Sequence, residues 1–141
     1  MNVMLPYSLA EHLLRMAEST KPHEACGLLL GSKKSAEVRV QDCIFSKNVT
    51  GGDSCIGFEI DPVLHLALQK QARASGKEII GVWHSHPTSL AIPSKEDQLR
   101  SLERGWLWLI TGWEEEAWKT KAFWAGFNDP ARFTATAILT V

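Results

Sequence analysis

Four polar side chains between residues 84 and 97 have types and spacings suited to metal chemistry. His84 and His86 are two positions apart, and Ser94 and Asp97 follow three positions apart. In an extended strand, residues i and i+2 point to the same side, so both imidazoles can reach one point in space. Two imidazoles and a carboxylate are the protein ligands of an open catalytic zinc site, which leaves a fourth position for water. This stretch therefore predicts a hydrolytic metal centre.

Each half of this pattern also has a purely structural interpretation. Two histidines at the end of a strand can simply be partly exposed residues at a strand edge. Ser94 and Asp97 form the S-x-x-D pattern of a helix-capping pair, in which the helix dipole also favours the acid. Capping and metal binding are compatible, because positions i and i+3 lie on one face of the first helical turn. A capped helix start would hold the Asp97 carboxylate rigidly.

Hydrolysis of an amide bond requires one more group, a carboxylate that moves a proton from water to the leaving amine. The sequence contains 16 acidic side chains, and residue types alone do not choose among them. Four of them are possible in principle: Glu59, Glu78, Glu96 and Glu103.

Hydrophobic patterning indicates the elements that must position these side chains. The stretch "EIIGVWHS" (78–85) is typical of a buried strand that ends at the histidines, and Pro87 cannot donate the next backbone hydrogen bond. Ser94 begins a helix that Gly105 stops. Functional groups commonly gather at such strand ends in α/β folds.

Two further helices and several strands are expected. A capping box of Ser8 and Glu11 begins the first helix, which ends at Lys21, and the second helix opens at Asp61 and stops at Gly76. The first two strands pair across a turn at 31–35. This mixture predicts an α/β fold in which helices flank one mixed central sheet, within a single domain over residues 1–141. Strands are expected at 25–31, 36–45, 58–60, 78–85, 105–113, 117–127 and 132–141.

Composition excludes several classes of partner. Fifteen basic and sixteen acidic residues nearly cancel, so we expect no nucleic-acid or anionic-membrane partner. No stretch is long and apolar enough to cross a bilayer, and the first residues do not resemble a signal peptide. Cys26, Cys43 and Cys55 are odd in number and lack CxxC spacing, so we expect reduced thiols. We therefore expect a cytoplasmic protein.

The complete pattern of His84, Ser85, His86, Pro87, six residues, Ser94, two residues and Asp97 resembles the signature of the JAMM zinc metalloproteases. Upstream, "HEACGLLLG" (23–31) resembles the second motif of that family, a glutamate just before a Gly-Leu-rich strand. "FEIDP" (58–62) and the helix after it are similar to single-domain prokaryotic members. The resemblance runs from about residue 7 to 112 and implies an MPN or cytidine-deaminase-like sandwich.

The resemblance implies a role for each residue of the motif. His84, His86 and Asp97 would bind one zinc ion per chain, with water as the fourth ligand. Glu24 would be the general acid/base, and Ser94 would donate a hydrogen bond to the oxyanion of the tetrahedral intermediate. Ser94 can also cap its helix, because a hydroxyl both donates and accepts. The structural alternative for Glu24 is a solvated residue after a turn.

The resemblance also implies a substrate class. The family hydrolyses amide bonds, often the peptide or isopeptide bond after the C-terminal glycines of ubiquitin or a ubiquitin-like protein, and small prokaryotic members suggest a sulfur-carrier protein. An extended Gly-Gly tail could bind along a strand edge by β-augmentation. We expect this groove at the loop 46–57 and the edge near Phe58. The chain lacks the long Cys/His-bearing insertion of endosomal deubiquitinases, which argues against specificity for linked ubiquitin chains.

Three other functions have to be distinguished. A non-catalytic MPN-type interaction module usually lacks the zinc ligands that this chain has. A RadC-like, DNA-associated protein carries a similar histidine and serine/aspartate pattern, but the balanced charge argues against DNA binding. A zinc nucleoside deaminase requires H-x-E and a downstream P-C-x-x-C, and the sequence contains neither.

Overall fold

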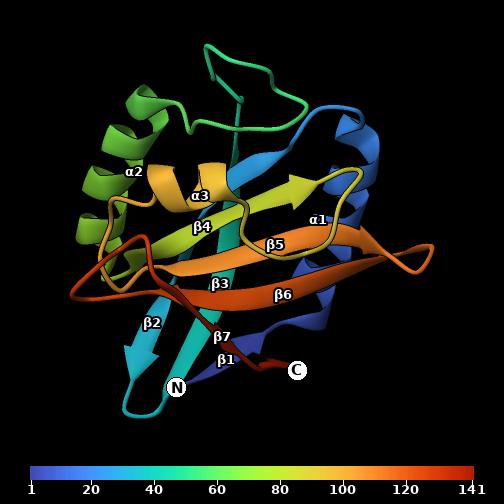
Figure 1. Cartoon of the computed structure of the whole chain (residues 1–141). Helices are drawn as coiled ribbons and strands as arrows, with labels where there is room; N and C mark the ends of the chain where they lie inside the picture. The colour runs from blue at the N-terminus through green and yellow to red at the C-terminus, as the bar shows by residue number, and fades with distance from the viewer.

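The computed structural model describes all 141 residues and consists of one eight-stranded mixed sheet with three helices (Figure 1). The elements are β1 (Asn2–Leu5), α1 (Tyr7–Thr20), β2 (Cys26–Lys34), β3 (Glu37–Ser46), α2 (Pro62–Ser75), β4 (Glu78–His86), α3 (Lys95–Arg100), β5 (Leu107–Glu114), β6 (Ala117–Ala125), β7 (Phe133–Thr136) and β8 (Ile138–Thr140). The strands lie side by side in the order β7-β6-β5-β4-β2-β3-β1-β8. The expected α/β class with a mixed central sheet is confirmed.

The two faces of the sheet bury different side chains. On one face, Leu13 of α1 packs in a cluster with Trp83 of β4. On the other face, Leu68 of α2 packs over Leu28 of β2, and a neighbouring cluster surrounds Val82 of β4. Figure 1 shows α3 in front of β4, whereas α1 passes behind β5 and β6. Because side chains alternate along a strand, the neighbours of Trp83 point toward α2 and α3.

The two outermost strands of the sheet are consecutive in the chain. Only Ala137 separates β7 from β8, although β7 pairs with β6 and β8 pairs with β1 at the opposite end of the strand order. The sheet must therefore curl until its edges lie beside each other, since one residue spans only about 3.8 Å between Cα atoms. The prediction of one continuous strand over 132–141 is wrong, because the two halves pair with different edges.

The start of the chain also differs from the expectation. β1 was not predicted, and it lies between β3 and β8, parallel to both. α1 begins after Pro6, whose side chain makes no capping hydrogen bond, and the N–H of Ala10 donates to the Pro6 carbonyl. Ser8 is already inside the helix, so the predicted capping box is wrong. The β2–β3 turn also comes later than expected, at Ser35, which has a positive φ of 50°.

Two further segments are shorter than predicted. Residues 58–60 form only an isolated bridge between Asn48 and Ile60 instead of a strand. α3 ends at Arg100, because Ser101 has an extended backbone and its hydroxyl donates to the carbonyl of Pro130 at 2.6 Å.

α2 follows its predicted boundaries. The Asp61 carboxylate accepts a hydrogen bond from the N–H of Val63 at 2.9 Å, and Gly76 ends the helix with a left-handed φ of 73°. No helix of the chain combines the length and the apolar character needed to span a lipid bilayer.

Candidate metal centre

The side chains of His84, His86 and Asp97 converge at the end of β4. Nε2 of His84 lies 3.0 Å from Nε2 of His86, and each of these nitrogens lies 3.1 Å from Oδ2 of Asp97. All three residues are buried, with at most 5% of their surface exposed. We call this arrangement the His–His–Asp triangle.

The three contacts of the triangle cannot all be hydrogen bonds, because the two histidines carry too few protons on Nε2. A cation at its centre would satisfy all three ligand atoms. Nδ1 of His86 lies 2.9 Å from the Leu90 carbonyl oxygen, which only accepts, so a neutral His86 presents a lone pair at Nε2. Burial lowers the pKa of His84, which favours its neutral form. Burial also lowers the pKa of His86, but Asp97 and the Leu90 carbonyl outweigh burial and raise it overall. If His86 were protonated and neutral His84 carried its proton on Nε2, the triangle would contain two Nε2 protons. Its three contacts, His84–His86, His84–Asp97 and His86–Asp97, would need three.

The separations within the triangle also fit a small divalent metal. In a tetrahedral site with metal–ligand distances of 2.0–2.1 Å, ligand atoms lie about 3.4 Å apart. The observed separations of 3.0–3.1 Å are close to that value. Two imidazoles and one carboxylate are a donor set that zinc accepts, so the residues present fit this ion.

Asp97 is fixed by the first turn of α3. Oγ of Ser94 accepts from the Asp97 N–H at 3.0 Å, and Oδ2 of Asp97 accepts from the Ser94 N–H at 2.9 Å. The predicted capping pair is therefore confirmed. Burial disfavours the Asp97 carboxylate, but His84, His86 and the Ser94 N–H outweigh burial and hold the pKa of Asp97 well below its usual range. The cap thus places a charged oxygen against both imidazoles.

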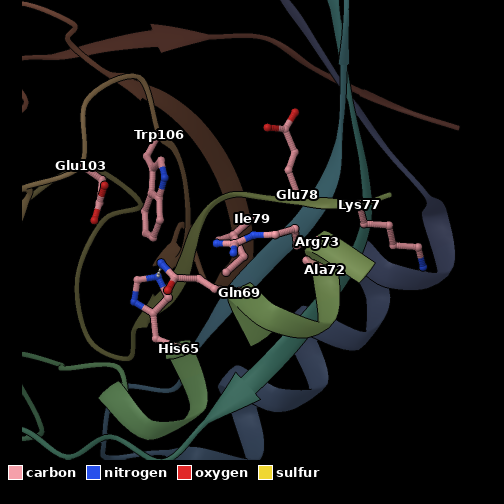
Figure 2. A pocket seen from close by; sticks show the side chains of 9 residues that line it. All are labelled: His65, Gln69, Ala72, Arg73, Lys77, Glu78, Ile79, Glu103 and Trp106. Carbon is pink, nitrogen blue, oxygen red and sulfur yellow. Dashed lines mark hydrogen bonds between the residues drawn. The ribbon is translucent and has the colours of Figure 1, made fainter. Parts of the chain in front are cut away.

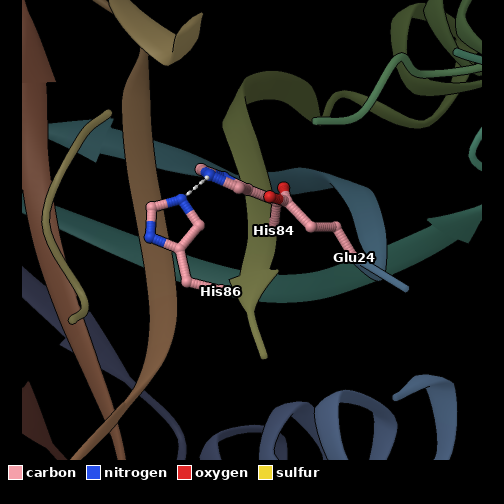
Figure 3. Close-up of side chains that lie close together, drawn as sticks. All are labelled: Glu24, His84 and His86. Carbon is pink, nitrogen blue, oxygen red and sulfur yellow. Dashed lines mark hydrogen bonds between the residues drawn. The ribbon is translucent and has the colours of Figure 1, made fainter. Parts of the chain in front are cut away.

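Glu24 lies just before β2 and directs its carboxylate toward the same place (Figure 3). One of its oxygens lies within 4.8 Å of ligand nitrogens of His84 and His86. The N–H of Glu24 donates to the Ser54 carbonyl at 2.8 Å, and the Asn48 amide donates to the Glu24 carbonyl at 3.2 Å. These two bonds tie Glu24 to the loop 46–57.

The Glu24 carboxyl is in an unusual environment for an acid. Only 4% of the residue is exposed, and Oε1 has no hydrogen-bond partner. Burial raises the pKa of Glu24 to about 8, against a partial opposing effect of His86. The interpretation of Glu24 as a solvated turn residue is therefore wrong. The group can exchange a proton near neutral pH, and it is a fourth potential metal ligand.

Two buried residues, Ser85 and Phe58, support the site through contacts that were not predicted. Ser85 lies between the two histidines and points to the opposite face, where its Oγ accepts from the Ala25 N–H at 2.8 Å. Ser85 thereby links β4 to the residue that follows Glu24. Phe58 stacks on the His84 ring, with a centroid separation of 4.4 Å and an interplanar angle of 21°. The alternation of a strand could have indicated the orientation of Ser85, whereas the sequence contains no signal for the Phe58 stacking.

A largely apolar cavity of about 390 Å³ opens beside the triangle. Phe58 and Trp108, which both contact His84, form part of its wall, and the strongly exposed Leu99 and Leu102 also line it. A second cavity of about 380 Å³ lies between α2 and the first residues of β4 (Figure 2). No residue of the His–His–Asp triangle lines either cavity, but only the first has walls that contact His84, through Phe58 and Trp108. The first cavity is therefore the candidate substrate site.

The sequence matches a family described as prokaryotic homologs of the JAB domain over residues 6–125. The chain belongs to this family. The resemblance to JAMM proteins is therefore confirmed. Two relatives of this JAB-domain protein are named desampylase. The protein from Haloferax volcanii is 28% identical over 103 residues, covering 73% of this chain and 72% of its own length. The protein from Pyrococcus furiosus is 32% identical over 120 residues, covering 82% and 79%.

Solved structures show the same architecture as this JAB domain. The solution structure of a protein from Desulfitobacterium hafniense superimposes with a TM-score of 0.84 at 27% identity, covering 99% of this chain and 92% of that one. The solution structure of a protein from Salinibacter ruber gives a TM-score of 0.69 at 22% identity, with 100% and 92% covered, and supports the fold alone.

Proposed function

We propose that this JAB-domain protein is a zinc-dependent hydrolase that cleaves the amide bond after the C-terminal Gly-Gly of a ubiquitin-like or sulfur-carrier protein. The observation that carries the proposal is the His–His–Asp triangle beside a buried carboxylate that lacks a partner. The name of the two relatives, desampylase, supports hydrolysis of a bond to a ubiquitin-like modifier.

His84, His86 and Asp97 are the residues that hold one zinc ion. Oδ2 of Asp97 lies 3.1 Å from Nε2 of both histidines, which favours Asp97 as the third ligand. When bound, zinc supplies a Lewis acid that polarises a carbonyl group and makes water acidic near neutral pH.

Glu24 and Ser94 perform the steps that the protein itself contributes. The unpartnered Oε1 of Glu24 takes a proton from the attacking water, and the resulting carboxylic acid gives it to the leaving amine. The raised pKa of Glu24 suits both directions of this transfer near neutral pH. Oγ of Ser94 accepts from the Asp97 N–H, which leaves its own proton free to donate to the developing oxyanion.

Because the metal centre is buried, it favours a substrate whose C-terminal tail is narrow. His84 and Asp97 are hardly exposed, so a segment without side chains reaches them most easily. Two glycines form such a segment, and the apolar cavity beside Phe58 can receive the residues before them. We propose that the groove is formed by the loop 46–57, which is hydrogen-bonded to Glu24, and by Phe58, which stacks on His84.

The three cysteines are free thiols, which supports a cytoplasmic site of action.

The experiment that tests this function uses a carrier protein whose C-terminal Gly-Gly is joined to the amine of a lysine-containing peptide. Incubation with the zinc-loaded protein should release the peptide and leave a carrier that ends in Gly-Gly, as measured by intact mass. Glu24→Gln should keep zinc and the fold but lower the rate by about 10²–10⁴, because the amide cannot accept the proton.

Glu116→Gln is the matched control, because Glu116 is exposed in the turn between β5 and β6 and should keep wild-type activity. Full activity of the Glu24→Gln protein would remove Glu24 from the mechanism. The absence of cleavage of any Gly-Gly-ended conjugate by the zinc-loaded wild type would reject the function.

A further inference from the structure

A hydrogen-bonded series connects His86 to a carboxylate outside the metal centre. Nδ1 of His86 donates to the Leu90 carbonyl at 2.9 Å. That carbonyl belongs to the same peptide group as the N–H of Ala91, which donates to Oε2 of Glu114 at 2.9 Å. Oε1 of Glu114 accepts from Nζ of Lys121 at 3.1 Å. One peptide group therefore separates a charged carboxylate from a proposed metal ligand.

The end of β5 clamps this peptide group in place. Ala91 is fully buried, and Gly112 approaches it so closely that a Cβ on Gly112 would lie 2.4 Å from the Ala91 nitrogen. The N–H of Trp113 also donates to the carbonyl of Ser89 at 2.9 Å. The peptide between residues 90 and 91 is thus held on the strand that carries Glu114.

The sheet register explains why Glu114 points toward the metal centre. His86 of β4 and Gly112 of β5 are neighbours in parallel strands, so they point to the same face. Glu114 lies two residues beyond Gly112 and shares that face. Its side chain is only 12% exposed, whereas that of Glu115, the next residue, is 89% exposed. Glu114 is thus far less exposed than its neighbour, and both of its carboxylate oxygens have hydrogen-bond partners.

We propose that Glu114 is a positioning residue for His86. By accepting the Ala91 N–H, the Glu114 carboxylate polarises the peptide and strengthens the bond from Nδ1 of His86 to Leu90. This keeps the His86 proton on Nδ1 and directs the Nε2 lone pair into the His–His–Asp triangle. This inference rests on one part of the proposed function, the binding of zinc by the His–His–Asp triangle.

The expected size of the effect follows from simpler metal sites. Where a carboxylate bonds directly to a ligating histidine, its removal typically weakens metal binding by about 10–100-fold. We expect the lower end of this range for Glu114, because a peptide group lies between the two side chains.

The test compares Glu114→Ala and Glu114→Gln with the neighbouring control Glu115→Gln in the full chain. The zinc dissociation constant is measured by competition with a chromophoric chelator. Glu114→Ala should raise it about 10-fold. Glu114→Gln should raise it about 3-fold, because the amide still accepts from Ala91 but carries no charge. Glu115→Gln should match the wild type.

A second readout separates positioning from a purely structural role. In the zinc-loaded proteins, the ¹H–¹⁵N NMR signal of the Nδ1 proton of His86 should move upfield in both Glu114 variants as its hydrogen bond weakens. A wild-type zinc affinity and a wild-type Nδ1 signal in Glu114→Gln would overturn the proposal. So would a lowered melting temperature with both readouts unchanged, which would assign Glu114 to loop packing alone.

Neither readout requires a substrate. If the wild type binds zinc but cleaves no conjugate, the proposed function fails while the affinities and NMR signals still decide the role of Glu114.

Discussion

At the scale of single residues, Asp97 combines two tasks on one atom. Its Oδ2 accepts the Ser94 N–H that closes the cap of α3, and the same oxygen faces the two imidazoles. A buried carboxylate is costly unless it is paired and hydrogen-bonded, and here three neighbours offset that cost. A change that removes only the charge should therefore affect metal binding more than the helix.

Asp97→Asn is the substitution that makes this change. The amide oxygen can still accept from Ser94, but it is a poor zinc ligand, so we expect zinc to fall from one ion per chain to nearly none. Elemental analysis of the purified protein measures the metal, and circular dichroism checks that the fold is kept. A variant that retains one zinc per chain would show that Asp97 is not a ligand.

At the scale of elements, α3 is a short helix that positions both Ser94 and Asp97. It has only six residues, which is too short to be stable through its own hydrogen bonds. The capping box at its start and the bond from Ser101 to Pro130 at its end hold it against the rest of the fold. Ser94 therefore has a structural task in addition to the proposed catalytic one.

Ser94→Ala should separate these two tasks by their magnitudes. Loss of the cap should lower the free energy of unfolding by about 1 kcal/mol, measured by urea denaturation. Loss of the hydroxyl donor should lower kcat by about 10²–10³, which a 1 kcal/mol change in stability does not produce in a folded protein. Ser94→Thr keeps both the cap and the hydroxyl, so it should recover most of the free energy of unfolding and most of kcat. If kcat falls in Ser94→Ala only as far as the folded fraction does, Ser94 has no catalytic role.

At the scale of the whole molecule, the metal centre should make the metal-free protein sensitive to pH. The pKa of Glu24 is raised to about 8 from its ordinary value of 4.5. A group whose pKa is higher in the folded state stabilises the fold below its unfolded pKa, and this contribution is lost as pH rises through the folded value. The pKa of Asp97 is lowered instead, so Asp97 changes the stability of the fold only below about pH 4. That is outside the pH range in which Glu24 acts.

We therefore expect Glu24→Gln to stabilise the metal-free protein more at pH 8 than at pH 5. Glutamine cannot ionise, so the difference from the wild type should grow by about 1 kcal/mol or more between these two pH values. Urea denaturation in the presence of a chelator measures it. With zinc bound, the positive charge favours the Glu24 carboxylate, so the difference should shrink. A difference that is equal at both pH values would mean that Glu24 ionises normally in the folded protein.

Much of the site was predictable because its spacing is local. A strand repeats every two residues, so His84 and His86 had to share a face, and the S-x-x-D pattern of Ser94 and Asp97 implied a cap. The same kind of reasoning placed the ends of α2 at Asp61 and Gly76. These features depend only on backbone geometry within a few residues.

Other features depended on packing between distant segments, for which the sequence contains no local signal. The burial of Glu24 requires the loop 46–57 and the end of β4, and the role proposed for Glu114 requires the register between β4 and β5. The last ten residues read as one strand, yet the curl of the sheet divides them at Ala137 between its two edges. Residue types and spacing along the chain thus determined which chemistry was available. The tertiary structure decided which carboxylates reach it, because burial and hydrogen bonding between distant segments exist only once the sheet has formed.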